Sequence, residues 1–198
     1  MARRGRQHST PRRPGRGARY ALPHLDSGEW LAGSEIFGDD DALVSAATLA
    51  GEYVLVGDNS LFSGVPNRVG VAAVGLEAAA ASGVLSPVED PFALWAPPDG
   101  SKVLVSSGFG DELLWLEATG DPAEPFANRG VVRTSGTSVA LPGTIVGMRR
   151  GSLKGLAVVS ENTGLRLVDL SGAEPEDRGF TSFGSGLDQI PGAFGVAP

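Results

Sequence analysis

The side chains that most often do catalytic chemistry are nearly absent from this chain of 198 residues. It contains no cysteine, which excludes disulfides, thiolate metal sites and cysteine nucleophiles. The only two histidines, His8 and His24, lie ahead of every repeated segment of the sequence. A histidine general base within the repeats is therefore excluded. The chemistry that remains is that of carboxylates, hydroxyls and arginines.

Carboxylates could still hold a cation, because Ca²⁺ prefers oxygen ligands. The longest acidic run is Asp39-Asp40-Asp41, directly after Gly38. Neighbouring residues of a strand point to opposite faces, so the three could meet on one ion only if the backbone looped. No Asp-x-Asp-x-Asp-Gly spacing accompanies them. We expect a solvated turn, with a weak Ca²⁺ contact as the alternative, and we predict no metal or cofactor site.

Two other motif types also fail to indicate a reaction. Gly108-Phe109-Gly110 and Gly184-Ser185-Gly186 have no helix after them, so no helix N-terminus is available to bind a phosphate. Ser135-Gly136-Thr137-Ser138 lacks the flanks of a nucleophile elbow and lacks a histidine partner. We therefore predict no catalytic residues and lean against an enzyme.

The charge is unevenly distributed along the chain. Seven of the 16 basic residues lie before residue 20, where no acidic residue occurs. The remainder has 9 basic and 23 acidic residues, a net charge of −14 against −7 for the whole chain. Such an acidic body repels nucleic acid and anionic membranes, so only residues 1–19 could attract them. We expect a disordered Arg-rich tail there, with a nucleic-acid-binding arm as the alternative.

Targeting signals are not visible. The paired arginines Arg3-Arg4 and Arg12-Arg13 are not followed by the apolar run of about 7–15 residues that an export signal needs. No stretch approaches the ~18 apolar residues of a membrane-spanning helix. The sequence therefore predicts no membrane span and leaves the compartment open.

A sequence phrase recurs about every fifty residues, a period typical of blades, solenoid turns or arrays. The clearest copy is Pro91-Phe92-Ala93-Leu94-Trp95-Ala96-Pro97-Pro98-Asp99-Gly100, which leads into Lys102-Val103-Leu104-Val105. A looser copy begins at Pro142, and another opens at Pro191. Each copy is long enough for one four-stranded unit.

Short runs rich in Val, Leu and aromatic residues, bounded by Gly, Pro, Asp and Asn, predict strands. The expected strands are 42–46, 53–56, 68–74 and 83–85, then 92–96, 102–106, 113–117 and 130–134, then 144–148, 156–159, 165–170 and 179–183. The second strand of each unit does not alternate and should be buried on both faces. In Leu165-Arg166-Leu167 the arginine lies opposite the two leucines. We expect Trp95, Trp115 and Phe92 to pack between units, and Leu76–Ala81 to form at most one helical turn.

The repeated unit resembles the YVTN-type β-propeller repeat. The match is best over Pro91–Gly120. It is looser over Pro142–Gly172, where Arg149-Arg150-Gly151-Ser152-Leu153-Lys154-Gly155 replaces the Pro-Asp-Gly turn, and Asp41–Gly75 lacks the opening proline. The resemblance covers most of the chain after residue 40. It implies a propeller of the lactonase-like superfamily, whose members include lactonase-like hydrolases, quinoprotein-like enzymes and non-catalytic surface proteins.

The resemblance implies an all-β propeller segment of about three four-stranded blades plus the first strand of a fourth. Residues 20–40 would be a lead-in, the blades would be 41–90, 91–141 and 142–190, and 191–198 would start the next. Closed propellers have at least four blades, so we expect a fragment of a longer propeller. A ring completed by two chains is one alternative, and outer strands supplied by residues 20–40 are another. Unfinished faces would favour self-association.

In a propeller, the loops joining second to third strands share one side with the loops joining blades. The side chains expected on that side, in a partly aromatic acidic rim, are Asp58, Asn59, Asp90, Phe109, Asp111, Glu161, Asn162 and Asp188. We expect ordinary solvated turns there, with a rim that binds a cation or a partner as the alternative.

For function, we expect a non-enzymatic binding or scaffold module with an unknown protein or small-molecule ligand. The alternative is a partial lactonase-like hydrolase whose catalytic blades are missing from this chain.

Overall fold

A computed structural model of the chain describes residues 21–23, 30–32, 44–59, 68–73, 81–85, 88, 90–108 and 110–183. These residues form strands, turns and one short 3-10 turn, η1 (Gly151–Leu153), without any α-helix, so the fold is all-β as predicted. None of their helical residues forms a segment with the length and apolarity needed to cross a bilayer. The acidic run at 39–41 and the helical turn expected at 76–81, apart from Ala81, lie outside the described residues.

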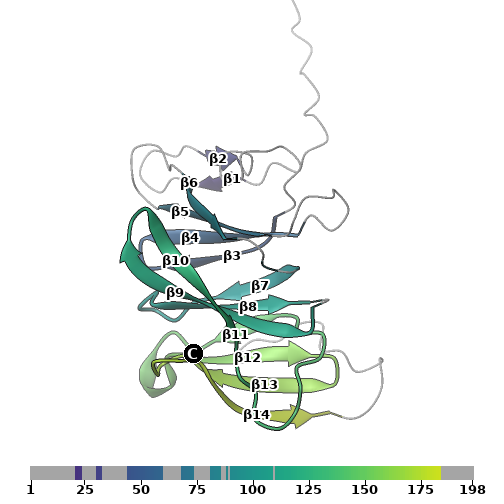
Figure 1. Cartoon of the computed structure of the whole chain (residues 1–198). Coiled ribbons are helices and arrows are strands. Elements are labelled where there is room, and N and C mark those ends of the chain that lie inside the picture. Colours follow the sequence, from purple (N-terminus) through teal and green to yellow (C-terminus); the bar gives the residue numbers. More distant parts are fainter. Residues whose placement is uncertain are drawn as a thin grey trace, which may run out of the picture.

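Twelve strands of the described chain form three antiparallel sheets of four, shown in blue, teal and green in Figure 1. The first sheet holds β3 (Val44–Ala50), β4 (Tyr53–Asp58), β5 (Arg68–Ala73) and β6 (Ala81–Leu85). The second holds β7 (Pro91–Trp95), β8 (Lys102–Ser107), β9 (Glu112–Asp121) and β10 (Glu124–Val131). The third holds β11 (Ile145–Gly147), β12 (Leu156–Glu161), β13 (Gly164–Asp169) and β14 (Glu176–Ser182). Each strand pairs with the next in sequence, and β1 (Ala21–Pro23) and β2 (Trp30–Ala32) form a separate pair.

The predicted strands overlap those of the three sheets, although β3 and β9 each extend four residues beyond the predicted ends at 46 and 117, and the largest difference is at the end of the second sheet. The strand expected at 130–134 is wrong, because the fourth strand is Glu124–Val131. A tight turn after Asp121, whose Oδ1 accepts a hydrogen bond from Ala123 N at 2.8 Å, folds β10 directly back along β9. Val131 ends the strand, and Val132 is buried beyond it.

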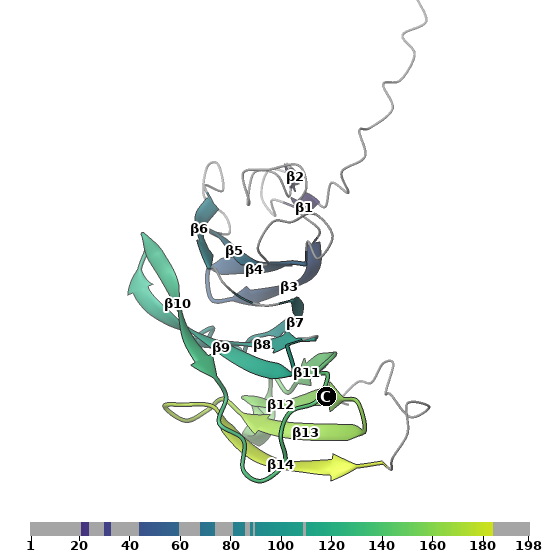
Figure 2. The same ribbon diagram turned by 45° about the vertical axis from the view of Figure 1, so that its right-hand side comes forward.

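The three sheets stack face to face, with the second in the middle (Figures 1 and 2). Val103 and Val105 of β8 join an apolar cluster with the first sheet, while Leu104 between them joins a cluster with the third. Every residue of β8 is buried, as its lack of alternation predicted. In β9, Leu116 faces the first sheet and Leu113 the third.

Aromatic side chains complete both contacts. The β9–β10 hairpin reaches the first sheet, where Phe126 meets Tyr53 edge to face with the ring centroids 5.8 Å apart. Trp95 packs so closely on Gly147 that a Cβ there would lie 2.1 Å from Trp95 Cζ2. Trp95 and Trp115 are buried as predicted, but Phe92 is 50% exposed. It stands at a register shift between Pro91 and Ala93, which explains why it lacks a place in the core.

Candidate binding surface

One end of the three sheets gathers the described residues of the connections β4–β5, β6–β7, β8–β9, β10–β11 and β12–β13. They meet there because consecutive strands run in opposite directions within each sheet. We call these connections, with the strand residues that border them, the loop end. The six rim residues that the structure describes all belong to it, whereas Phe109 and Asp188 lie outside the described residues.

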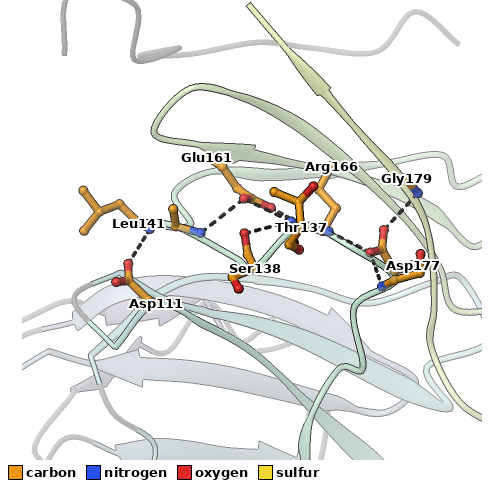
Figure 3. Close-up of polar contacts among 10 residues, drawn as sticks. Asp111, Thr137, Ser138, Leu141, Glu161, Arg166, Asp177 and Gly179 are labelled. Carbon is orange, nitrogen blue, oxygen red and sulfur yellow. Dashed lines mark hydrogen bonds and ion pairs between the residues drawn. The ribbon is translucent and has the colours of Figure 1, made fainter. Parts of the chain in front are cut away.

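A buried arginine organises the loop end of the third sheet (Figure 3). Arg166 of β13 has no exposed side-chain surface and lies between Glu161, which it contacts through Nε, and Asp177, whose Oδ2 is 2.7 Å from Nη1. Its Nη2 also donates to the backbone oxygens of Thr137 at 3.0 Å and Ser138 at 3.3 Å. Burial would lower the pKa of Arg166, but hydrogen bonds and charge from the two carboxylates outweigh it, and the pKa is raised. The guanidinium is therefore a permanent cation.

The arginine and its carboxylates hold the long β10–β11 connection, residues 132–144, which we call the strap. Strap backbone N–H groups donate to side-chain oxygens on both sides of it: Ser135 to Asp177, Ala140 to Glu161 and Leu141 to Asp111. Figure 3 shows this row of contacts along the strap. Because most of the strap pairs with no strand, its backbone groups need these partners.

The first sheet also pairs a buried acid with an arginine at the loop end. Asp58, the last residue of β4, is fully buried, and its Oδ2 lies 2.9 Å from Nε of Arg68 at the start of β5. In both sheets an acid that ends the second strand is thus neutralised by an arginine of the third. In the second sheet the corresponding residue is Ser107, which is also fully buried.

The loop end is consequently not the open acidic rim that the sequence suggested. Asp58 and Glu161 are buried in ion pairs, and Asp90 is buried as well. Asn59 and Asn162 directly follow the two paired acids and are half-buried. Asp111 is the one exposed acid among the described rim residues. The sequence prediction missed Arg68, Arg166 and Asp177, and the one available signal was the placement of Arg166 opposite two leucines.

Backbone strain is concentrated at this end. Among the described residues, all three non-glycine residues with a positive φ lie in its connections: Asp90 at 43°, Asp111 at 50° and Leu141 at 46°. Aspartate tolerates this conformation, but leucine rarely adopts it. Leu141 is nevertheless 41% exposed, so its side chain gains little from packing in return.

An exposed aromatic ring lies at the same end. A Cβ added at Gly108, after β8, would lie 3.4 Å from Phe92 Cβ and 3.0 Å from Asp90 Oδ2. Phe92 therefore stands beside the β6–β7 and β8–β9 connections. The loop end presents to solvent a phenyl ring, a leucine and the Asp111 carboxylate.

Most of the polar side chains described at the loop end are paired with one another or with the strap. The described residues contain no group of three or more acidic, histidine or cysteine side chains placed to hold a metal. They contain no histidine, and the buried carboxylates of Asp58, Glu161 and Asp177 already accept hydrogen bonds from arginine or the strap. What remains for a partner is a mixed surface of apolar side chains and one carboxylate.

The chain matches no known protein family, no curated protein and no solved structure. The fold and the loop end together define it as an all-β protein of three stacked four-stranded sheets with a polar network at one end.

Proposed function

We propose that the three sheets are consecutive blades of a YVTN-type β-propeller, and that the chain is a non-enzymatic binding or scaffold module that contacts its partner through the loop end. Three features support the blade assignment. Each sheet is a four-stranded meander, the repeat period has the length of a blade, and neighbouring sheets bury continuous apolar clusters between them.

The observation that carries the binding proposal is the gathering of positive-φ residues at one end of the sheets. Strained conformations persist where the surrounding structure enforces them, and they concentrate at functional sites. Leu141 is the most telling case, because it has both an unfavourable φ and an exposed side chain. A residue selected only for stability would be glycine at this position.

The exposed side chains of the loop end suit a partner that has an apolar face and a hydrogen-bond donor. The charges of Asp58 and Glu161 are neutralised by Arg68 and Arg166. We therefore do not propose that the loop end binds cations. A partner would cover Phe92 and Leu141 and donate a hydrogen bond to Asp111. Such a combination of exposed apolar anchors with a single polar contact is typical of peptide and protein recognition.

The proposal is tested with a displayed library of random peptides selected on the purified full-length protein. We expect the selected peptides to lose at least tenfold in affinity for Phe92→Ser and for Leu141→Gly. Leu49→Ser is the matched control, because Leu49 is equally exposed, at 52%, on β3 near the opposite end of the sheets. Peptides that bind both loop-end variants as tightly as the unchanged protein would overturn the proposal.

A second measurement separates recognition from structure. Leu141→Gly relieves the positive φ, so we expect the thermal midpoint to stay level or to rise while peptide binding is lost. A lowered midpoint would assign Leu141 to the fold instead. The purified protein is also assayed for hydrolysis of a panel of lactones. Hydrolysis that persists in every loop-end variant would favour the hydrolase alternative over the binding module.

A further inference from the structure

The end of the sheets opposite the loop end carries a concentrated basic loop. The β11–β12 connection contains Arg149, Arg150 and Lys154, three of the nine basic residues that follow residue 19, in an otherwise acidic chain. All residues from 149 to 154 are exposed. The sequence Arg149-Arg150-Gly151-Ser152-Leu153 replaces the Pro-Asp-Gly turn of the neighbouring repeat.

The loop is held by backbone hydrogen bonds at its base and by the contact of Arg149 with Ala96 O of the second sheet. Met148 and Gly155 close it through the hydrogen bond from Gly155 N to Met148 O at 3.1 Å. Inside it, η1 buries no residue, and the Lys154 N to Gly151 O contact is long at 3.4 Å. Because so little packing would be lost, the loop can open locally at small cost.

The arginines of this loop precede Ser152 at the spacing that arginine-directed protein kinases select. Kinases that select arginine use carboxylates to bind guanidinium groups before the acceptor residue, and charge patterns of this kind set their specificity. Ser152 has arginines two and three residues before it, and it is the one serine or threonine in the sequence that does. Leu153, the next residue, is 51% exposed and free to enter an apolar pocket.

We propose that Ser152 is a phosphorylation site for an arginine-directed serine/threonine protein kinase. In the transfer, Ser152 Oγ forms a bond to the γ-phosphorus of ATP, and the bond from that phosphorus to the β–γ bridging oxygen breaks. ADP leaves, and the hydroxyl proton passes to a carboxylate of the kinase. The site is independent of the proposed binding function, because it lies at the other end of the sheets.

Phosphorylation at this position would change the loop itself. The phosphate adds a charge of about −1.5 to −2 within reach of three basic side chains of the same loop. Arg149 Nη1 now donates to Ala96 O of the second sheet at 3.2 Å. A phosphate competes for this arginine, so modification would weaken one contact between the second and third sheets at this end.

The test incubates the folded full-length protein with ATP, Mg²⁺ and a purified arginine-directed kinase, the cAMP-dependent kinase serving as the probe. All variants carry Ser9→Ala and Thr10→Ala, so that the Arg-rich N-terminal segment contributes no acceptor. We expect phosphate on Ser152 by peptide mapping, none with Ser152→Ala, and a rate at least tenfold lower with Arg150→Gln. Ser135 is the internal comparison, since it is exposed but has one arginine, Arg133, before it.

Three results would overturn the proposal. One is a folded protein that stays unmodified while the synthetic peptide 145–158 is phosphorylated, because the fold would then conceal the site. Another is an Arg150→Gln variant modified at the same rate as the unchanged loop, or Ser135 modified as fast as Ser152. The third is protein isolated from its own growing and starved cells that never carries phosphate on Ser152.

Discussion

The two interfaces between the sheets are built on different principles. Between the first and second sheets the contact is apolar, and at the loop end the bulged residue Ser45 bonds the backbone oxygen of Pro91. Between the second and third sheets a similar apolar cluster is extended by the strap, which contributes Val132 and Val139. Backbone groups of the strap that pair with no strand are hydrogen-bonded to side chains instead. Arg166 donates to the carbonyl oxygens of Thr137 and Ser138, and Asp177 accepts from the N–H of Ser135.

The contrast between exposed and buried ion pairs in the third sheet indicates when the burial of a charged group stabilises the fold. The exposed pairs of the third sheet, such as Arg178 with Asp169, remain in contact with water and stabilise little. Arg166, Glu161 and Asp177 form a buried triad. We attribute its burial to the strap, which packs against the second and third sheets and needs hydrogen-bond partners there. Ion pairs of this kind gain little over an apolar core, but they are costly to break from one side.

Removing the central cation should produce the largest effect. Arg166→Met leaves Glu161 and Asp177 buried without a counter-charge and leaves the carbonyl oxygens of Thr137 and Ser138 without their donor. We expect a loss of about 3–5 kcal/mol in the free energy of unfolding, measured by urea denaturation.

The matched control is Arg178→Met, which also removes an arginine that bridges two carboxylates, Asp169 and Glu176. Arg178 is exposed, so its loss should change the unfolding free energy little. If the two variants were equally stable, the buried triad would have no special role in holding the strap.

The apolar parts of the two interfaces should be equally sensitive. Leu113 and Leu116 are both fully buried on β9 and face opposite interfaces. We expect Leu113→Ala and Leu116→Ala each to cost about 3 kcal/mol, within the usual range for a buried leucine. Urea denaturation of both variants gives the comparison. A much smaller cost for either would show that its interface is loosely packed.

The Asp58–Arg68 pair of the first sheet should respond less than Arg166 with Glu161 and Asp177. Asp58→Asn keeps the shape of the side chain but removes the charge opposite Arg68, whose side chain retains some access to water. We expect a loss of about 1–3 kcal/mol. The double variant with Arg68→Met should lose less than the sum of the two single losses. Strict additivity would contradict a direct interaction between these side chains.

Most of the strands could be predicted because their signal is local. The uninterrupted apolar run of Val103 to Val105 and the alternation around Arg166 each depend on residues next to one another, and both predictions are confirmed. The Pro-Asp-Gly turn could also be recognised, and Gly100 has a positive φ of 67°, a conformation that favours glycine. The error at 130–134 arose because two adjacent valines serve different roles, one at a strand end and one in the strap.

The site was harder to predict because its partners are far apart in the sequence. Arg166 binds carbonyl oxygens 28 and 29 residues before it and a carboxylate 11 residues after it. No spacing rule connects such positions, so the acids of the loop end were expected to be solvated. Phe92 was misplaced for a related reason, since a register shift between two strands leaves no local mark in the sequence.

The smallest expected effect is a change in the pH dependence of stability when the surface carboxylate of Asp169 is removed. Burial would raise the pKa of Asp169, but hydrogen bonds from Ser171 and the contact with Arg178 lower it below its usual 3.8. A carboxylate with a lowered pKa in the folded state stabilises the fold above its usual pKa and loses this contribution as the pH falls. Asp169→Asn should therefore flatten the loss of stability between about pH 5 and pH 2, as measured by urea denaturation at each pH.

Arg166 should contribute nothing to the same titration. An arginine is protonated in the unfolded state throughout acidic and neutral pH, and the pKa of Arg166 is raised further in the folded state, so its stabilisation would be lost only at strongly alkaline pH. Arg178→Met should flatten the acid limb less than Asp169→Asn does, because the Ser171 hydrogen bonds remain. An acid limb identical in Asp169→Asn and the unchanged protein would show that this surface carboxylate is solvated in the same way whether the chain is folded or not.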